Sequence, residues 1–299
     1  MAGAATAVTD WEARGTRVAA GDGEAFVLDT DPGGATGDRA GRPPLLVLHG
    51  FPSSSFDFRH VLPELGADRR VVLPDYLGFG LSTKPDRRYG IRTYADEVEA
   101  VVVAVGLAGA TVDLLTHDLG DSVGGELLAR SLDGSLGFEV GRRVITNGSI
   151  YMDLVQLSVG QQFLLALPDE RADFGGADGF GNGLGGTFSP EHPASPEELE
   201  AQWLLASRDG GHTLLPRTIR YIEDRRVEEH RYTGAIERHP SPLAIVWGEV
   251  DPIAVHPMAL RLAERVPAAP LTTLDGVGHY PMVEDPARFA AAVLAGLEP

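Results

Sequence analysis

Two residue types that can act as nucleophiles lie four positions apart near the middle of the chain. Asp118 and Ser122 both belong to the segment TVDLLTHDLGDSVGGEL at 111–127. A carboxylate can attack an sp³ carbon and form an alkyl ester, whereas a serine attacks a carbonyl and forms an acyl ester. Ser122 is the centre of a literal G-x-S-x-G, a pattern typical of a nucleophile on a sharp strand-to-helix turn. The two residues therefore predict different chemistry.

The position of the preceding strand favours one of the two. Apolar residues suited to a buried strand end at Leu115, and the apolar spacing becomes nearer to helical from Val123 onward. If Ser122 were at the turn, the strand would have to continue through polar and glycine residues that suit strands poorly. With Asp118 at the turn, Ser122 falls in the first or second turn of the following helix. We therefore predict Asp118 as the nucleophile and keep Ser122 as the alternative.

Short apolar runs alternate with helical patterns along the chain, which predicts an α/β fold with a doubly wound, mostly parallel sheet. Further strands are expected at 44–48, 71–74, 144–146, 242–248 and 271–274. Ligands of such sheets bind at the carboxyl ends of the strands. Polar residues follow several of the expected strands at this edge: His49, Asp75, Asp118 and Asn147.

Two later residues could complete a catalytic triad. Asp251 follows the strand expected at 243–247, in WGEVDP, and His279 follows the strand expected at 271–274, in DGVGHYP. Asp251 would accept the imidazole proton and fix the tautomer of the histidine, so that His279 faces the nucleophile. Asn147 is an alternative position for the acid. The order along the chain, nucleophile, acid and histidine, is one in which such triads occur.

The alternation of strands and helices stops between about 150 and 237. Helices are expected there at 155–167, 196–205 and 216–227, and the glycine-rich run FGGADGFGNGLGG at 174–186 is expected to be a flexible connection. Residues 1–15 are expected to be a loose lead. We therefore predict a core formed by 1–149 and 238–299, with an inserted helical cap at 150–237.

The composition restricts the class of protein. A formal net charge of −18 argues against nucleic acid or an anionic membrane as partner, since both would repel the chain. There is no cysteine, which excludes thiolate chemistry and thiolate metal sites. No apolar run approaches the roughly 20 residues that span a bilayer, and the N-terminus lacks the features of a secretory signal. We expect a cytoplasmic protein, as a monomer or a homodimer.

Several motifs spread over about 44–299 resemble the α/β-hydrolase fold family. They are HGFP at 49–52, DYLGFGLS at 75–82, the turn around Asp118, WGEVDP and GVGHYP. The T-H-D-L-G turn resembles the branch with an aspartate nucleophile, which comprises epoxide hydrolases and haloalkane dehalogenases. Within that branch, HDLGD, ITNGSI and GHYPMVEDP are most similar to the mesoderm-specific transcript proteins.

The resemblance implies a cofactor-free hydrolase that forms an alkyl ester on Asp118 and hydrolyses it with water activated by His279. The backbone N–H groups of Phe51 and Leu119 are the implied oxyanion donors. Epoxide hydrolases use cap tyrosines to protonate the epoxide oxygen. Tyr221 in TIRYIEDRR resembles one of these tyrosines, and a second could be Tyr151 or Tyr232. The implied substrate is a small hydrophobic organic molecule, with an epoxide as the first expectation.

Some positions depart from the resemblance. A haloalkane dehalogenase would be expected to carry Asn at the position of Phe51 and Trp at Leu119, and epoxide hydrolases commonly have Trp and Gly at Leu119 and Asp121. Three alternatives therefore stay open: a serine esterase using Ser122, a haloalkane dehalogenase, and a non-catalytic ligand-binding member of the fold.

Overall fold

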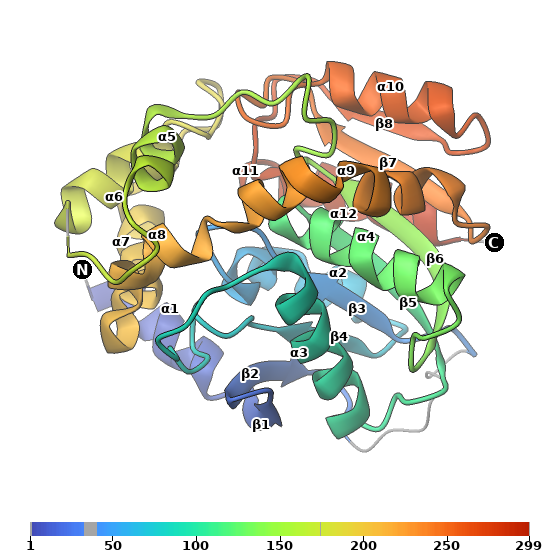
Figure 1. The fold of residues 1–299 in the computed structure, drawn as a ribbon, viewed down its shortest axis with the longest axis horizontal. Coiled ribbons are helices and arrows are strands. Elements are labelled where there is room, and N and C mark those ends of the chain that lie inside the picture. The colour runs from blue at the N-terminus through green and yellow to red at the C-terminus, as the bar shows by residue number, and fades with distance from the viewer. Residues whose placement is uncertain (1, 33–40, 174, 299) are drawn as a thin grey trace.

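The predicted α/β architecture is confirmed by the structure, a computed structural model that describes residues 2–32, 41–173 and 175–298. Within these residues the strands form an eight-stranded sheet in the order β1-β2-β4-β3-β5-β6-β7-β8 (Figure 1). Pairing is antiparallel between β1 and β2 and between β2 and β4, and it is parallel across the rest of the sheet. The strands are β1 (Thr16–Ala20), β2 (Gly23–Asp29), β3 (Leu45–Leu48), β4 (Val71–Pro74), β5 (Thr111–His117), β6 (Glu139–Thr146), β7 (Leu243–Gly248) and β8 (Leu271–Leu274).

Helices cover both faces of the sheet because its central strands are apolar on both sides. In β3, Leu46 and Leu48 belong to one buried core, whereas Leu45 and Val47 belong to the other. This division follows from the alternation of side chains along a strand. The first core is closed by α3 (Ile91–Ala104), α4 (Leu119–Leu132) and α10 (Pro257–Arg265); the second is closed by the 3-10 helix η1 (Ser55–His60), α2 (Leu62–Leu65), α11 (Pro281–Glu284) and α12 (Pro286–Leu297).

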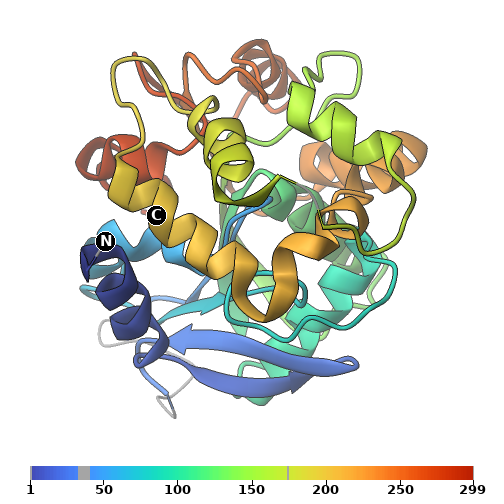
Figure 2. The same ribbon diagram turned by 90° about the vertical axis from the view of Figure 1, so that its left-hand side faces the viewer.

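Between β6 and β7 the chain forms a run of helices, with no strand among the described residues of this segment. Figure 1 shows α5 to α8 together at the left, and Figure 2, seen from that side, shows them facing the viewer. Ser158 and Ser195 accept hydrogen bonds from the first turns of α5 and α7, which is the local reason that these helices begin where they do. The elements are α5 (Val159–Ala166), α6 (Gly176–Gly185), α7 (Pro196–Ser207), η2 (Arg208–Leu214), α8 (Leu215–Thr218) and α9 (Tyr221–Arg238).

The prediction of a loose N-terminal lead was wrong. Residues Ala2–Glu12 form the helix α1, which packs against α7 and η1. The buried side chains Ala4, Val8 and Trp11 recur at helical spacing on the packed face. Ala4 and Val8 lie among alanines and glycine, so the apolar pattern is weak in the sequence. The helix α7, which covers them, comes from a distant part of the chain.

The prediction of a flexible glycine-rich connection was also wrong over 176–185, which form α6; residue 174 of this run lies outside the described residues. Glycine is about 1 kcal/mol less favourable than alanine in a helix interior. Tertiary contacts stabilise the helix in this case, since Leu184 is buried and Phe180 packs on Trp203 of α7 with ring centroids 5.7 Å apart.

None of the helices in the described part of the chain is long and apolar enough to cross a membrane.

Candidate active site

Asp118 lies at the sharp turn between β5 and α4. Its backbone has φ 49° and ψ −109°, a conformation that non-glycine residues rarely adopt and that is found at functional turns. Two segments pack so closely at this turn that each needs a glycine. A Cβ on Gly120 would lie 2.3 Å from the Leu48 carbonyl oxygen, and a Cβ on Gly50 would lie 2.9 Å from the Asp118 Cβ. β5 continues two residues beyond Leu115, and α4 begins at Leu119. Ser122 therefore lies inside α4 rather than at the turn.

The loop after β3 supplies a backbone donor to Asp118. The Phe51 N–H donates to Asp118 Oδ2 at 2.8 Å, and the carboxylate is buried. His49 orders this loop: its Nε2 accepts from the Tyr76 N–H at 3.2 Å, so its Nδ1 carries the proton and donates to the Gly50 carbonyl at 2.8 Å. Leu119 is the first residue of α4, where backbone N–H groups have no partner within the helix. Both N–H groups suggested by the sequence thus border Asp118.

The loops after β7 and β8 bring Asp251 and His279 together. His279 Nδ1 is 2.7 Å from Asp251 Oδ2, and both side chains are buried. The other oxygen, Oδ1, accepts from the N–H groups of Ile253 and Ala254. Asp251 is therefore fixed by backbone donors on one oxygen and orients the imidazole with the other.

Asn147 holds Asp251 and does not replace it. Its side-chain amide donates to Asp251 Oδ2 at 2.7 Å, and its carbonyl oxygen accepts from the Gly248 N–H at 3.0 Å. Its φ of 50° lets the side chain turn inward after β6. An amide carries no charge to stabilise an imidazolium, so the alternative acid position considered from the sequence is wrong: the partner of His279 is Asp251.

Electrostatics give the two neighbouring histidines opposite protonation. Burial alone would lower the pKa of His279, but the charge of Asp251, the hydrogen bond to it and the charge of Asp118 raise this pKa to about 9. Burial and the positive His279 lower the pKa of His117 to about 3. Neutral His117 contacts the backbone carbonyl of His279 through Nε2 at 2.8 Å, a structural role.

Removing the charge of Asp118 is expected to lower the pKa of His279, and removing that of Asp251 to lower it further, because Asp251 contributes more. The measurement is a pH titration of the imidazole by NMR in the parent protein, Asp118→Asn and Asp251→Asn, with His279→Gln to assign the resonance. The parent should titrate well above the ordinary value near 6.5. An unchanged pKa in Asp118→Asn would contradict the electrostatic coupling of the two residues.

A cavity of about 270 Å³ borders this site. Phe51 and His279 line it from the core, and the inserted segment contributes its aromatic walls, Phe163, Phe180 and Trp203. Four glycines at one end and along one side of α6 also line it: Gly175, Gly176, Gly179 and Gly183. The segment expected to be a flexible connection thus forms a wall of the cavity. The sequence offered no signal for this, because glycines lining a ligand space look like a loop.

The three tyrosines suggested by the sequence occupy different environments. Tyr221, the first residue of α9, is buried with its ring centroid 5.8 Å from that of Phe51, and burial followed by the charge of Asp118 raises its pKa. The Tyr151 hydroxyl instead bonds Glu237 at 2.8 Å, and the Tyr232 hydroxyl bonds Glu228 at 2.9 Å. None of these three tyrosines lines the 270 Å³ cavity. Only Tyr221 is brought close to the loop that holds Asp118.

Arg225 is a buried residue near the site that the sequence did not indicate. Its Nε donates to Ser122 Oγ at 2.8 Å. The hydroxyl oxygen of Ser122 is thus engaged by a cation from α9. In the sequence Arg225 is one of several arginines in a charged helical run, a pattern that usually indicates a solvated face.

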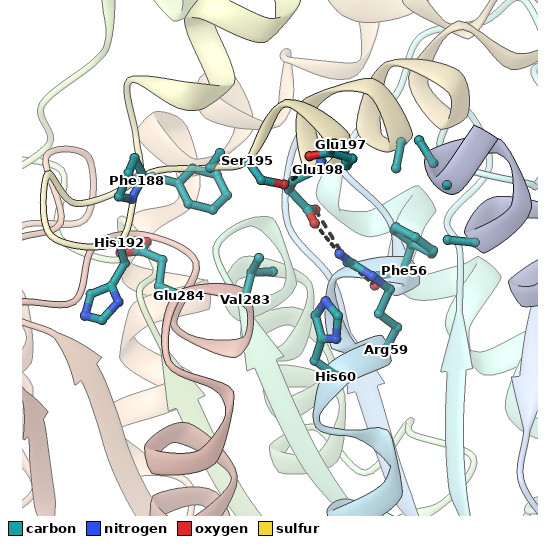
Figure 3. Close-up of a pocket in the computed structure, with 16 residues that line it drawn as sticks. Phe56, Arg59, His60, Phe188, His192, Ser195, Glu197, Glu198, Val283 and Glu284 are labelled. Atoms are coloured by element: carbon teal, nitrogen blue, oxygen red, sulfur yellow. Dashed lines mark hydrogen bonds and ion pairs between the residues drawn. The ribbon is translucent and has the colours of Figure 1, made fainter. Parts of the chain in front are cut away.

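A second hollow, of about 540 Å³, lies between α1, η1, α7 and the loop before α7 (Figure 3). Arg59 and Glu198 form an ion pair within it, with His60, His192 and Glu284 at its sides. It is larger than the cavity at His279, but none of Asp118, Asp251 and His279 lines it. Of these three residues His279 lines the smaller cavity, which is therefore the candidate active site.

Comparisons with known proteins agree with this fold. The model of the alpha/beta hydrolase family matches residues 45–292. The chain is 41% identical over 290 residues to LipZ of Mycobacterium tuberculosis, covering 96% of this chain and 97% of that protein. It is 31% identical over 263 residues to the mesoderm-specific transcript protein of Mus musculus, covering 85% and 78%. The solved structure of the epoxide hydrolase CorEH is 18% identical and superposes with a TM-score of 0.71 over 94% of this chain and 97% of that one. The chain therefore belongs to the α/β-hydrolase family and is a hydrolase of that fold.

Proposed function

We propose that this hydrolase forms a covalent alkyl ester on Asp118 and opens an epoxide to a diol. The observation that carries the proposal is the strained backbone of Asp118 at the turn between β5 and α4. The competing nucleophile, Ser122, lies one helical turn further on and accepts a hydrogen bond from Arg225. A lone pair held by a guanidinium is less available for attack, which argues against the serine esterase.

In the first step Asp118 attacks an epoxide carbon. Oδ2 is held by the Phe51 N–H, so Oδ1 is the oxygen free to attack. The C–O bond of the epoxide breaks as the ester bond forms, and the departing alkoxide takes the proton of Tyr221. The products are an ester of Asp118 with a free hydroxyl on the neighbouring carbon, and a tyrosinate.

In the second step His279 takes a proton from water through Nε2, since Nδ1 is bonded to Asp251. The resulting hydroxide attacks the carboxyl carbon of the ester, and the N–H groups of Phe51 and Leu119 stabilise the oxyanion. Collapse releases the diol and restores the carboxylate, and the proton on His279 returns through solvent to Tyr221. Esterification removes the charge of Asp118, which had raised the pKa of His279. The histidine thereby becomes able to act as a base once the ester has formed.

The lining of the cavity supports a hydrophobic substrate. Aromatic and aliphatic side chains of the inserted segment dominate its walls, together with α6 glycines that leave space. We assign 150–237 as a cap over the core and a small hydrophobic epoxide as substrate. Neither step needs a cofactor. The halide donors that a dehalogenase would be expected to carry at 51 and 119 are replaced by Phe51 and Leu119.

A single turnover in H₂¹⁸O tests the mechanism. With enzyme in excess over an epoxide such as styrene oxide, the diol should contain no ¹⁸O, because its new oxygen comes from Asp118. One ¹⁸O should instead appear in the peptide that carries Asp118, as measured by mass spectrometry. Under multiple turnovers the diol should gain ¹⁸O. Direct ¹⁸O incorporation into the diol in the first turnover would exclude the ester mechanism.

A further inference from the structure

Arg225 is a buried cation that the proposed reaction does not yet use. It is 2% exposed, and no carboxylate lies within ion-pair distance of it among the residues that the structure describes. Nε bonds the neutral Ser122, and Nη2 has no hydrogen-bond partner. Removing a guanidinium from water is costly unless a compensating anion or hydrogen bond is present. The burial of Arg225 beside Ser122 and Tyr221 therefore needs a physical explanation.

Arg225 connects the two helices that carry the reacting groups. Ser122 lies four residues after Asp118 and Arg225 lies four residues after Tyr221, so each contact residue sits one helical turn beyond a reacting one. α4 and α9 pack closely against each other, and Figure 1 shows them side by side. The bond from Arg225 to Ser122 thus fixes the first turn of α9 against the first turn of α4.

Arg225 also lies against the ring of Tyr221. The guanidinium carbon is 5.0 Å from the ring centroid, within the range of a cation–π contact. A guanidinium has only donors, so it can favour negative charge on the tyrosine but cannot accept its proton. The phenolic proton of Tyr221 therefore has to go to another acceptor, which in the proposed reaction is the departing alkoxide.

We propose that Arg225 is a positioning residue that holds Tyr221 over Asp118 and stabilises the tyrosinate formed when Tyr221 gives its proton to the departing alkoxide. The inference rests on the proposed function. Asp118 is buried, and its charge disfavours a tyrosinate at Tyr221, whereas burial raises the pKa of Asp121 well above its usual range. Arg225 offsets that repulsion, and its effect is on ester formation, because the attack of water on the ester does not use Tyr221 and Tyr221 only regains its proton afterwards.

The test separates the two steps by rapid quenching and mass spectrometry of the Asp118 peptide. Arg225→Met should slow ester formation by at least about tenfold, since general acid catalysis contributes about 10²–10⁴-fold. The rate of ester hydrolysis should stay within about threefold of the parent rate, because His279 and Asp251, which act in that step, are unchanged. Arg225→Lys should recover part of the rate. The matched control is Arg226→Met, on the neighbouring exposed residue, which should match the parent.

A second comparison separates stabilisation of charge from packing. The defect of Arg225→Met should be larger with propylene oxide than with its trifluoromethyl analogue, whose less basic alkoxide needs less proton donation. Equal slowing of both steps, equal defects with both epoxides, or ester formation at the parent rate would each overturn the inference. Should Arg225→Met fail to fold, Arg225→Lys carries the same comparison. Absence of any ester in the parent protein would instead refute the proposed function.

Discussion

Asp118→Asn is expected to lower kcat/KM for epoxide hydrolysis by about 10⁴-fold or more, the scale seen when a nucleophile is removed. The amide has nearly the same shape and keeps an oxygen for the Phe51 N–H, which now bonds Oδ2 at 2.8 Å. It lacks the negative charge that displaces the alkoxide. Steady-state kinetics and the thermal unfolding temperature of both proteins are the measurements; the unfolding temperature should not fall, because a buried charge is removed without loss of shape.

Ser122→Ala is the matched comparison for this variant. It removes a hydroxyl that accepts from Arg225 but leaves the turn and the guanidinium in place. The expected loss of kcat/KM is less than about tenfold, because the guanidinium stays in place and its lost hydrogen bond to Ser122 affects the reaction only through Tyr221. An inactive Ser122→Ala together with an active Asp118→Asn would make the protein a serine hydrolase. If the parent shows no turnover and Asp118→Asn binds the ligand with unchanged affinity, the protein is better described as a non-catalytic ligand-binding protein.

His279→Gln is expected to accumulate one substrate mass on the peptide that carries Asp118. Attack by Asp118 does not require the histidine, whereas hydrolysis of the ester does. Removing a general base slows the dependent step by about 10²–10⁴-fold, so the ester outlives the first step and steady-state turnover falls to the hydrolysis rate. Incubation with excess epoxide, followed by digestion and mass spectrometry, measures the occupancy.

The control for this experiment is the double variant His279→Gln with Asp118→Asn, in which no adduct should form. Asp251→Asn should accumulate the ester to a lesser extent, since Asn147 and the backbone donors still hold the loop that faces His279. Because Asp118 and Ser122 are four residues apart and can lie on the same peptide, fragmentation of the peptide is needed to show which residue carries the adduct. Modification of Ser122 would refute Asp118 as the nucleophile.

Much of the fold and the core of the site could be predicted from the sequence because their causes are local. Apolar runs such as the one in β3 have to be covered on both faces, which requires helices on both sides of the sheet. Parallel strands bring their carboxyl ends to one edge, so Asp118, Asp251 and His279 could be grouped from their positions after strands. The turn at Asp118 was indicated by where the apolar run ends, although β5 extends two residues further than that run.

The parts that failed depend on contacts between distant segments. α1 is helical because α7 and η1 cover its small apolar face, and α6 is helical in spite of its glycines because Phe180 and Leu184 pack on neighbouring residues. The helical spacing of Ala4, Val8 and Trp11 is only a weak local signal for α1, and propensity alone favours a loop for the glycine-rich α6.

The sequence by itself determined that a carboxylate, an acid and a histidine follow strands of one α/β sheet, because strand and turn preferences are properties of neighbouring residues. Only the tertiary structure decided the environment of each group. It directed the hydroxyls of Tyr151 and Tyr232 to glutamates, left Tyr221 beside Phe51, and placed Arg225 between the helices that carry Asp118 and Tyr221. The physical reason is that burial, charge and hydrogen-bond partners depend on which segments pack together. The residues that α4 and α9 bring together lie about a hundred positions apart in the chain.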